Sequence, residues 1–322
     1  MRQVTLVPFL ILQMIFASKA FAIAEISAFR RETNGITLTG ENCDLLKRHL
    51  PALANWKTSL NEIPQKPSSA CTCDSFRCYM DIEEVVPQIV ETYQDVEAGR
   101  WGPNCWNAVL VASKILPVLR YTPPEEMSFW MASPLCQPVA DSEMLQPGDI
   151  AAIREGGQGE IHASIFITEE LYFSKNALTT SSSYKLQSSL GIFNLFPVPF
   201  ACRHSVGQPT NCPSYVNYFR CSSFSDYTRA HNISFTPRYQ EFEALILEQE
   251  KIISKIVFEW KRNPLLQQQS PQLLREAQLK MNRIRNEVVN RAGDISTTAD
   301  QRLLWNGLKF RIDGLFLSIA WI

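Results

Sequence analysis

Residues 145–168, with the sequence LQPGDIAAIREGGQGEIHASIFIT, decide the fold. The tetrapeptide 146–149 (QPGD) predicts a turn, and the apolar run 150–153 behind it predicts a short strand. The glycines of 155–159 indicate a hairpin loop. Residues 161–168 are rich in β-branched and aromatic side chains, as a second strand requires. The stretch therefore predicts an antiparallel hairpin within a small sheet.

The chain downstream of this hairpin extends the predicted sheet. Glu169 and Glu170 form a tight turn into a third strand at 171–174. Residues 181–189 are polar and predict a loop or an edge strand. The apolar run 193–201 is a candidate final strand, although two prolines interrupt it, and a loop region punctuated by cysteines follows.

The chain upstream supplies the predicted helix for this sheet. Residues 105–119 carry apolar side chains with a 3.6-residue period, directly after the breaker cluster 101–104. Pro103 and Asn104 are typical helix-start residues, so Cys105 is expected in the first turn. Further helices are expected at 41–57 and 81–98. Residues 64–78 read as a loop pinned by disulfides.

From residue 237 onward the composition becomes helical. Three apolar stripes predict a helical hairpin or a three-helix bundle, with Ser270 as an N-cap and Pro271 at the first helical position of the second helix. Such stripes are typical of core rather than of a cofactor site. The predicted fold class is α+β: a helix packed on a small antiparallel sheet, followed by a helical module. The chain is predicted to have four parts. They are a leader segment at 1–22, a disulfide-rich N-terminal region at 23–80, a domain that contains the sheet and the candidate catalytic residues at 81–225, and a helical domain at 238–322.

Residues 1–22 have the features of a cleavable signal peptide. Arg2 precedes an apolar run at 4–17, and Ala20 and Ala22 form an A-x-A site, so cleavage is expected after Ala22. The alternative is a membrane anchor, but the run is shorter than the roughly 20 residues that span a bilayer. No later segment is long and apolar enough for an anchor. The sequence therefore predicts export to the periplasm or the extracellular space.

The charge balance and the cysteines limit the class of protein. The 31 basic and 32 acidic residues are interspersed, which gives no indication of nucleic-acid binding or of electrostatic membrane binding. Nine cysteines in an exported chain predict disulfides with one cysteine left over, and Cys105 is the natural one to be left out because it begins a predicted helix. Cys71, Cys73 and Cys78 are candidate metal ligands, but their spacing fits no common zinc motif and an oxidising compartment favours disulfides. No cofactor is implied.

Cys105 and His162 are the candidate catalytic pair. A helix N-terminus stabilises a thiolate, and a histidine takes its proton. In the predicted strand, His162 and Ser164 share one face, while Ala163 and Ile165 lie on the other. The alternatives are a disulfide or an inert core thiol at Cys105 and a structural histidine at 162.

Three motifs in this region resemble the NlpC-type cell-wall cysteine peptidases, which are papain-like. They are 104–108 (NCWNA), similar to the nucleophile helix of that family; 145–150 (LQPGDI), similar to its L-x-P-G-D strand start; and 162–167 (HASIFI), similar to its histidine strand. Their order also matches, over about a quarter of the chain. The resemblance implies hydrolysis of amide bonds in peptidoglycan stem peptides, with Cys105 as nucleophile, His162 as base and then acid, and first-turn N–H groups as the oxyanion hole.

The chain also departs from the family pattern. Asn104 stands where the family has Asp, and Trp106 and Asn107 stand where it has Ser-Gly. The position that orients the histidine falls at Ser174, where the family more often has His, Asn or Gln. Asn176, two residues on, is the alternative orienting residue.

Four more residues are candidate substrate-binding residues. Trp101 and Trp106 flank Cys105, where they line a substrate groove or pack in the core. Asn104 precedes the thiol, and Ser164 shares the His162 face of the strand.

Two functions are carried forward, with an acyltransferase on the same scaffold as a third. The first is an exported cysteine hydrolase that acts on peptidoglycan or another peptide. In this function the C-terminal helices are a candidate binding surface for a protein partner. The second is a catalytically inactive papain-like fold that acts as an extracytoplasmic binding or scaffold protein.

Overall fold

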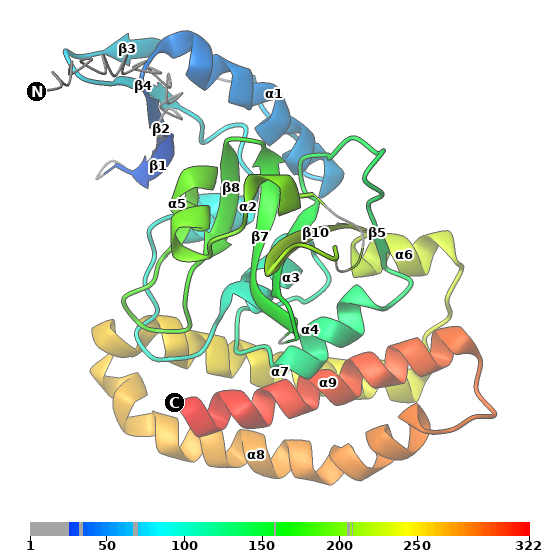
Figure 1. The fold of residues 1–322 in the computed structure, drawn as a ribbon. Coiled ribbons are helices and arrows are strands. Elements are labelled where there is room, and N and C mark those ends of the chain that lie inside the picture. The colour runs from blue at the N-terminus through cyan, green and yellow to red at the C-terminus, as the bar shows by residue number, and fades with distance from the viewer. Residues whose placement is uncertain (1–25, 32–34, 67–69, 158, 205–206, 208) are drawn as a thin grey trace, which may run out of the picture.

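The computed structural model describes residues 26–31, 35–66, 70–157, 159–204, 207 and 209–322. The predicted signal peptide lies outside these residues. The described part of the chain is a mixed α+β fold, with a ten-stranded antiparallel sheet and helices that follow and flank it (Figure 1). This agrees with the predicted class.

The sheet has the strand order β3-β4-β2-β1-β9-β8-β7-β6-β10-β5. Its strands are β1 (Ser27–Arg30), β2 (Ile36–Gly40), β3 (Cys71–Cys73), β4 (Cys78–Asp81), β5 (Cys136–Pro138), β6 (Ile150–Glu155), β7 (Gly159–Thr168), β8 (Leu171–Lys175), β9 (Tyr184–Ser188) and β10 (Ser214–Cys221). The predicted hairpin is β6–β7, and the third predicted strand is β8. The same sheet continues into the N-terminal region, because β1 pairs with β9 and β2 pairs with β4.

The helices that accompany the sheet are α1 (Cys43–Ser59), α2 (Gln88–Tyr93), α3 (Cys105–Ala112), α4 (Pro124–Met131), α5 (Ser189–Leu195) and α6 (Phe224–Ala230). Three longer helices follow: α7 (Pro237–Glu259), α8 (Pro264–Ala292) and α9 (Ala299–Trp321). In Figure 1 these three form a layer at one end of the molecule, opposite the end that carries α1, β3 and β4. The predicted three-helix module is thereby confirmed.

The two faces of the sheet pack against different helices. On one face, Ala163 and Ile165 of β7 belong to the central apolar cluster, together with Ala108 and Val109 of α3. On the other face, Phe166 belongs to a separate cluster that includes Ile192 and Phe193 of α5. Side chains alternate along a strand, so each residue of β7 contacts one of these two layers and not the other.

Several predicted elements are wrong in extent or type. The run 193–201 is not a strand, because residues 189–195 form α5 and prolines follow it; the last long strand is β10, in a region predicted as loop. Residues 184–188 form an interior strand between β8 and β1, not an edge. The helix expected at 105–119 ends at Ala112, and the one expected at 81–98 is reduced to α2.

The start of α8 also differs from the prediction. Asn263 is its N-cap and accepts a hydrogen bond from the Leu266 N–H at 3.0 Å, with Pro264 at the first helical position. Pro271 lies inside the helix, and Ser270 donates to the Gln267 carbonyl. The helix therefore begins at the Asn263-Pro264 pair and not at the Ser270-Pro271 pair seven residues later.

A buried ion-pair network joins the helical module to the rest of the fold. Arg120 makes two 2.7 Å hydrogen bonds to Glu126 of α4 and one of 3.0 Å to Glu250 of α7. Glu250 also accepts hydrogen bonds of 2.7 and 3.1 Å from Arg311 of α9. A Cβ at Gly314 of α9 would collide with Arg120, so glycine is required where the two meet.

Eight of the nine cysteines form disulfides: Cys43–Cys71, Cys73–Cys78, Cys136–Cys221 and Cys202–Cys212. Cys105 is the free thiol, which confirms the prediction that it is the one left over. Within the described residues, no helix has the length and apolar character needed to span a membrane.

Candidate active site

Cys105 is the first residue of α3, as predicted. Asn104 is the N-cap, and its side chain accepts a hydrogen bond from the Asn107 N–H at 3.0 Å. The Asn104 amide also donates to the Thr122 carbonyl at 2.7 Å. Both ends of this side chain are thus used in local structure, and substrate binding by Asn104 stays a prediction.

Asn107 explains one departure from the family pattern. Its buried side chain donates to the Thr122 hydroxyl at 3.0 Å and accepts from the Arg120 N–H at 2.9 Å. These bonds hold the loop after α3 against the first turn of the helix. The residue is structural here, and a glycine at this position would leave the Arg120 N–H unsatisfied.

The thiol of Cys105 is buried between α3 and the sheet, with only 8% of the residue exposed. Burial raises its pKa to about 11. The N–H groups of Ala163 and Trp106 and the positive charge of Lys175 lower the pKa but do not offset the burial. At neutral pH Cys105 is therefore a protonated thiol, which is a weak nucleophile.

Lys175 is the basic residue that the structure brings to Cys105. It ends β8 on the same face as Phe173, and Nζ donates to the backbone carbonyls of Ala177 and Thr179. Burial lowers its pKa to about 8, although the nearby Cys105 acts in the opposite direction. Sequence reasoning missed Lys175; the signal was its place on the same strand face as the apolar Phe173.

His162 lies on the opposite face of the sheet from Cys105. It is paired with Ile153, which belongs to the α5-side cluster, whereas its neighbour Ala163 belongs to the α3-side cluster. The His162 ring stacks on Phe196 with centroids 4.0 Å apart. The predicted pairing of Cys105 with His162 is therefore wrong, because strand alternation directs His162 away from α3.

The environment of His162 holds it neutral. The ring is fully buried, and neither ring nitrogen has a hydrogen-bond partner among the described residues. Burial lowers its pKa to about 3. A histidine with so low a pKa is a weak base, because almost none of it is protonated near pH 7.

The predicted orienting residues bond to each other instead of to His162. Ser174 donates to the Asn176 side-chain oxygen at 3.0 Å, and Gln187 Nε2 donates to both residues, at 2.7 and 2.8 Å. Ser164 shares the His162 face and is buried, and its hydroxyl has no partner in the described part of the chain. Neither Ser174 nor Asn176 therefore bonds to His162, and Ser164 lies on the face of β7 opposite α3.

The two tryptophans differ in their surroundings. Trp101 is 45% exposed and stacks on Trp321, the last residue of α9, with ring centroids 5.7 Å apart. Trp106 is half-buried against the central apolar cluster. Trp106 thus packs against this cluster, while Trp101 contacts the end of the helical module.

A cavity of about 790 Å³ lies elsewhere, between α2, α3 and the helices α7 and α9. Its walls include the apolar Val111, Ile115 and Phe258. Lys251 and Lys255 of α7 also line it; both are exposed and neither has an ion-pair partner within the described ranges. This volume is in the range of small-molecule sites, which favour interfaces between structural units.

Replacing His162 by phenylalanine tests its buried, neutral state. The histidine pKa is about 3 in the fold against an ordinary 6.5, so below pH 6.5 the unfolded chain binds the extra proton. Wild-type stability should therefore fall with decreasing pH, by about 1.4 kcal/mol per unit from this residue. We expect His162→Phe to remove about 2 kcal/mol of the stability loss between pH 7 and pH 5 in urea titrations. An identical loss in both proteins would contradict this placement.

Comparison of the chain with protein-family models, with curated proteins and with solved structures finds no match. The class defined by fold and site is therefore the coarse one: a mixed α+β protein with a capped helix, a buried free thiol and a three-helix module.

Proposed function

We propose that this chain is an extracytoplasmic binding protein on a catalytically inactive papain-like scaffold. The observation that carries the proposal is the separation of Cys105 and His162 by the sheet. The packing of α3 against an antiparallel sheet fits the resembled family, and four disulfides fit an exported protein. Hydrolysis by the resembled mechanism would need a thiolate and a histidine base at one place; at neutral pH Cys105 is a protonated thiol, and His162 lies across the sheet from it.

The cavity between the body and the helical module is the binding site in this proposal. Its apolar walls suit the hydrophobic part of a ligand. Lys251 and Lys255, which have no ion-pair partner among the described residues, suit an anionic group on the same ligand. A small amphipathic anion combines the two properties. The C-terminal helices then have a defined role, because α7 and α9 supply one side of the site.

Filling the cavity tests this assignment. Val111 and Ser254 line the cavity from α3 and α7, and both are half-buried, so the double variant Val111→Trp/Ser254→Trp should occupy part of the space. We expect wild type to bind one equivalent of anilinonaphthalene sulfonate, an aromatic anion, with a Kd at least about 10-fold lower than that of the filled variant. Leu279→Trp on the exposed part of α8 is the matched control and should bind like wild type.

The charge requirement has a separate test. Lys251→Glu/Lys255→Glu should weaken binding of the sulfonate while leaving binding of uncharged phenylnaphthylamine unchanged. Equal affinity of wild type and the filled variant for both probes would overturn the cavity as the binding site.

A further inference from the structure

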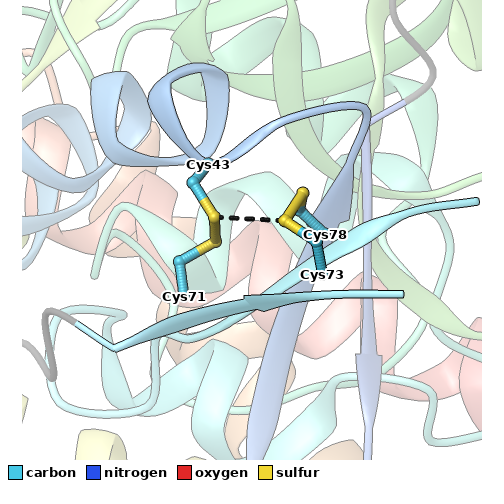
Figure 2. A group of neighbouring side chains, drawn as sticks. All are labelled: Cys43, Cys71, Cys73 and Cys78. Carbon is cyan, nitrogen blue, oxygen red and sulfur yellow. Dashed lines mark hydrogen bonds between the residues drawn. A yellow bond between two sulfur atoms is a disulfide. The ribbon is translucent and has the colours of Figure 1, made fainter. Parts of the chain in front are cut away.

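Four cysteines from three elements converge at the end of the sheet opposite the helical module. Cys43 opens α1, Cys71 and Cys73 bound β3, and Cys78 opens β4. They form two disulfides, Cys43–Cys71 and Cys73–Cys78. The disulfides touch: the Sγ atoms of Cys43 and Cys73 are 3.5 Å apart, and all four Sγ atoms lie within 4.8 Å of one another (Figure 2).

This convergence is unnecessary for two separate disulfides, but a metal site requires it. Four thiolates around Zn²⁺ have Zn–S distances of about 2.3 Å, which places tetrahedral sulfurs about 3.8 Å apart. The contact between Cys43 and Cys73 is already close to that spacing. Binding of an ion requires only that the two bonded pairs separate and that their hairpin widens to match.

The local environment favours thiolates once the disulfides are reduced. Cys43 is in the first turn of α1, whose N-cap Asn42 accepts a hydrogen bond from the Leu45 N–H at 2.8 Å. The positive end of the helix dipole stabilises a negative sulfur there. Cys73 is exposed, whereas Cys78 is buried, so a reductant reaches this disulfide from the Cys73 side.

We propose that Cys43, Cys71, Cys73 and Cys78 form a redox-dependent zinc site, with two disulfides in the oxidised state and a Zn²⁺ tetrathiolate in the reduced state. Two equivalents of a dithiol reductant supply the chemistry. Each equivalent reduces one disulfide to two thiols and is itself oxidised to a disulfide. The four thiols release four protons when they bind Zn²⁺. Both states cross-link α1, β3 and β4, so this corner of the fold is retained in either one.

Cobalt is the spectroscopic probe for this site, because tetrahedral Co²⁺ bound to four thiolates has intense visible absorption and replaces Zn²⁺ isomorphously. The full mature chain is reduced anaerobically with a phosphine and titrated with Co²⁺. We expect one equivalent to bind with the tetrathiolate spectrum, and one equivalent of Zn²⁺ to abolish that spectrum. Native mass spectrometry should show one zinc ion in the reduced protein and none in the oxidised protein.

Two cysteine-pair variants separate this cluster from the other cysteines, which the phosphine also reduces. Cys71→Ser/Cys78→Ser removes two ligands and should lose the spectrum, while Cys136→Ala/Cys221→Ala keeps the cluster and should retain it. A reduced wild type without a stoichiometric tetrathiolate spectrum, whether folded or unfolded, would overturn the proposal. Retention of the spectrum in Cys71→Ser/Cys78→Ser would overturn it as well.

Discussion

Replacing Glu250 by alanine is expected to destabilise the protein by about 3–5 kcal/mol, because it leaves Arg120 and Arg311 buried without their shared partner. Burial by itself raises the pKa of Glu250, but the attraction of Arg311 and Arg120 outweighs it and holds the pKa below its ordinary value. The carboxylate is therefore charged at neutral pH. It joins α7 to α9 and to the loop that follows α3.

Chemical denaturation of Glu250→Ala measures this effect, and the same helix offers a control. Glu248 pairs with Lys280 at 3.0 Å on the surface of the module, with its side chain 55% exposed. Glu248→Ala should change the free energy of unfolding by no more than about 1 kcal/mol. Equal, small losses in the two variants would show that the network does not hold the module to the fold.

Alkylation of Cys105 is expected to be about 100-fold slower at pH 8 than alkylation of an unperturbed thiol. Burial raises its pKa from 9.0 to about 11, and each unit lowers the thiolate fraction tenfold. The rate with iodoacetamide should rise about tenfold per pH unit up to about pH 11. Because Cys105 is the one free cysteine, mass spectrometry of the oxidised protein follows this reaction without interference.

Lys175 provides the control for this measurement. Its charge favours the thiolate, so Lys175→Met should slow alkylation of Cys105 further. A rapid reaction at pH 6 in wild type would contradict the buried, protonated thiol and would restore a nucleophilic role.

The sequence carried enough information to find the hairpin β6–β7, the capped helix α3, the free Cys105 and the three long helices. Each depends on local patterns: a Pro-Gly-Asp turn, an Asn cap and 3.6-residue apolar stripes. The turn is built as expected, with Gly148 at φ +102° and Asp149 accepting a hydrogen bond from the Gln146 N–H at 2.8 Å.

The candidate site was predicted less well, because the side of the sheet that receives α3 is a tertiary property. Alternation along β7 was assigned correctly, with His162 and Ser164 on one face and Ala163 and Ile165 on the other. The apolar face was the natural partner for the apolar helix α3, and this places His162 on the far side. The similarity to the family motifs predicted instead that Cys105 and His162 lie together, and this pairing is wrong.

The extended N-terminal half of the sheet could not be predicted for a different reason. Strands β1 to β4 are three to five residues long, and they are stabilised by pairing with distant strands and by disulfides. Strand β10 was predicted as loop because cysteines and prolines surround it in the sequence, although it pairs with β6 over six residues. Long-range pairing of this kind leaves little trace in a local pattern.

Incubation with purified peptidoglycan tests the central claim most directly. Mature wild-type protein and Cys105→Ala are each incubated with the polymer, and mass spectrometry of the released material follows. We predict no released fragments from either protein, because Cys105 is a protonated thiol and His162 lies across the sheet from it. Stem-peptide fragments released by the wild type and absent with Cys105→Ala would contradict the binding function and establish a cysteine hydrolase.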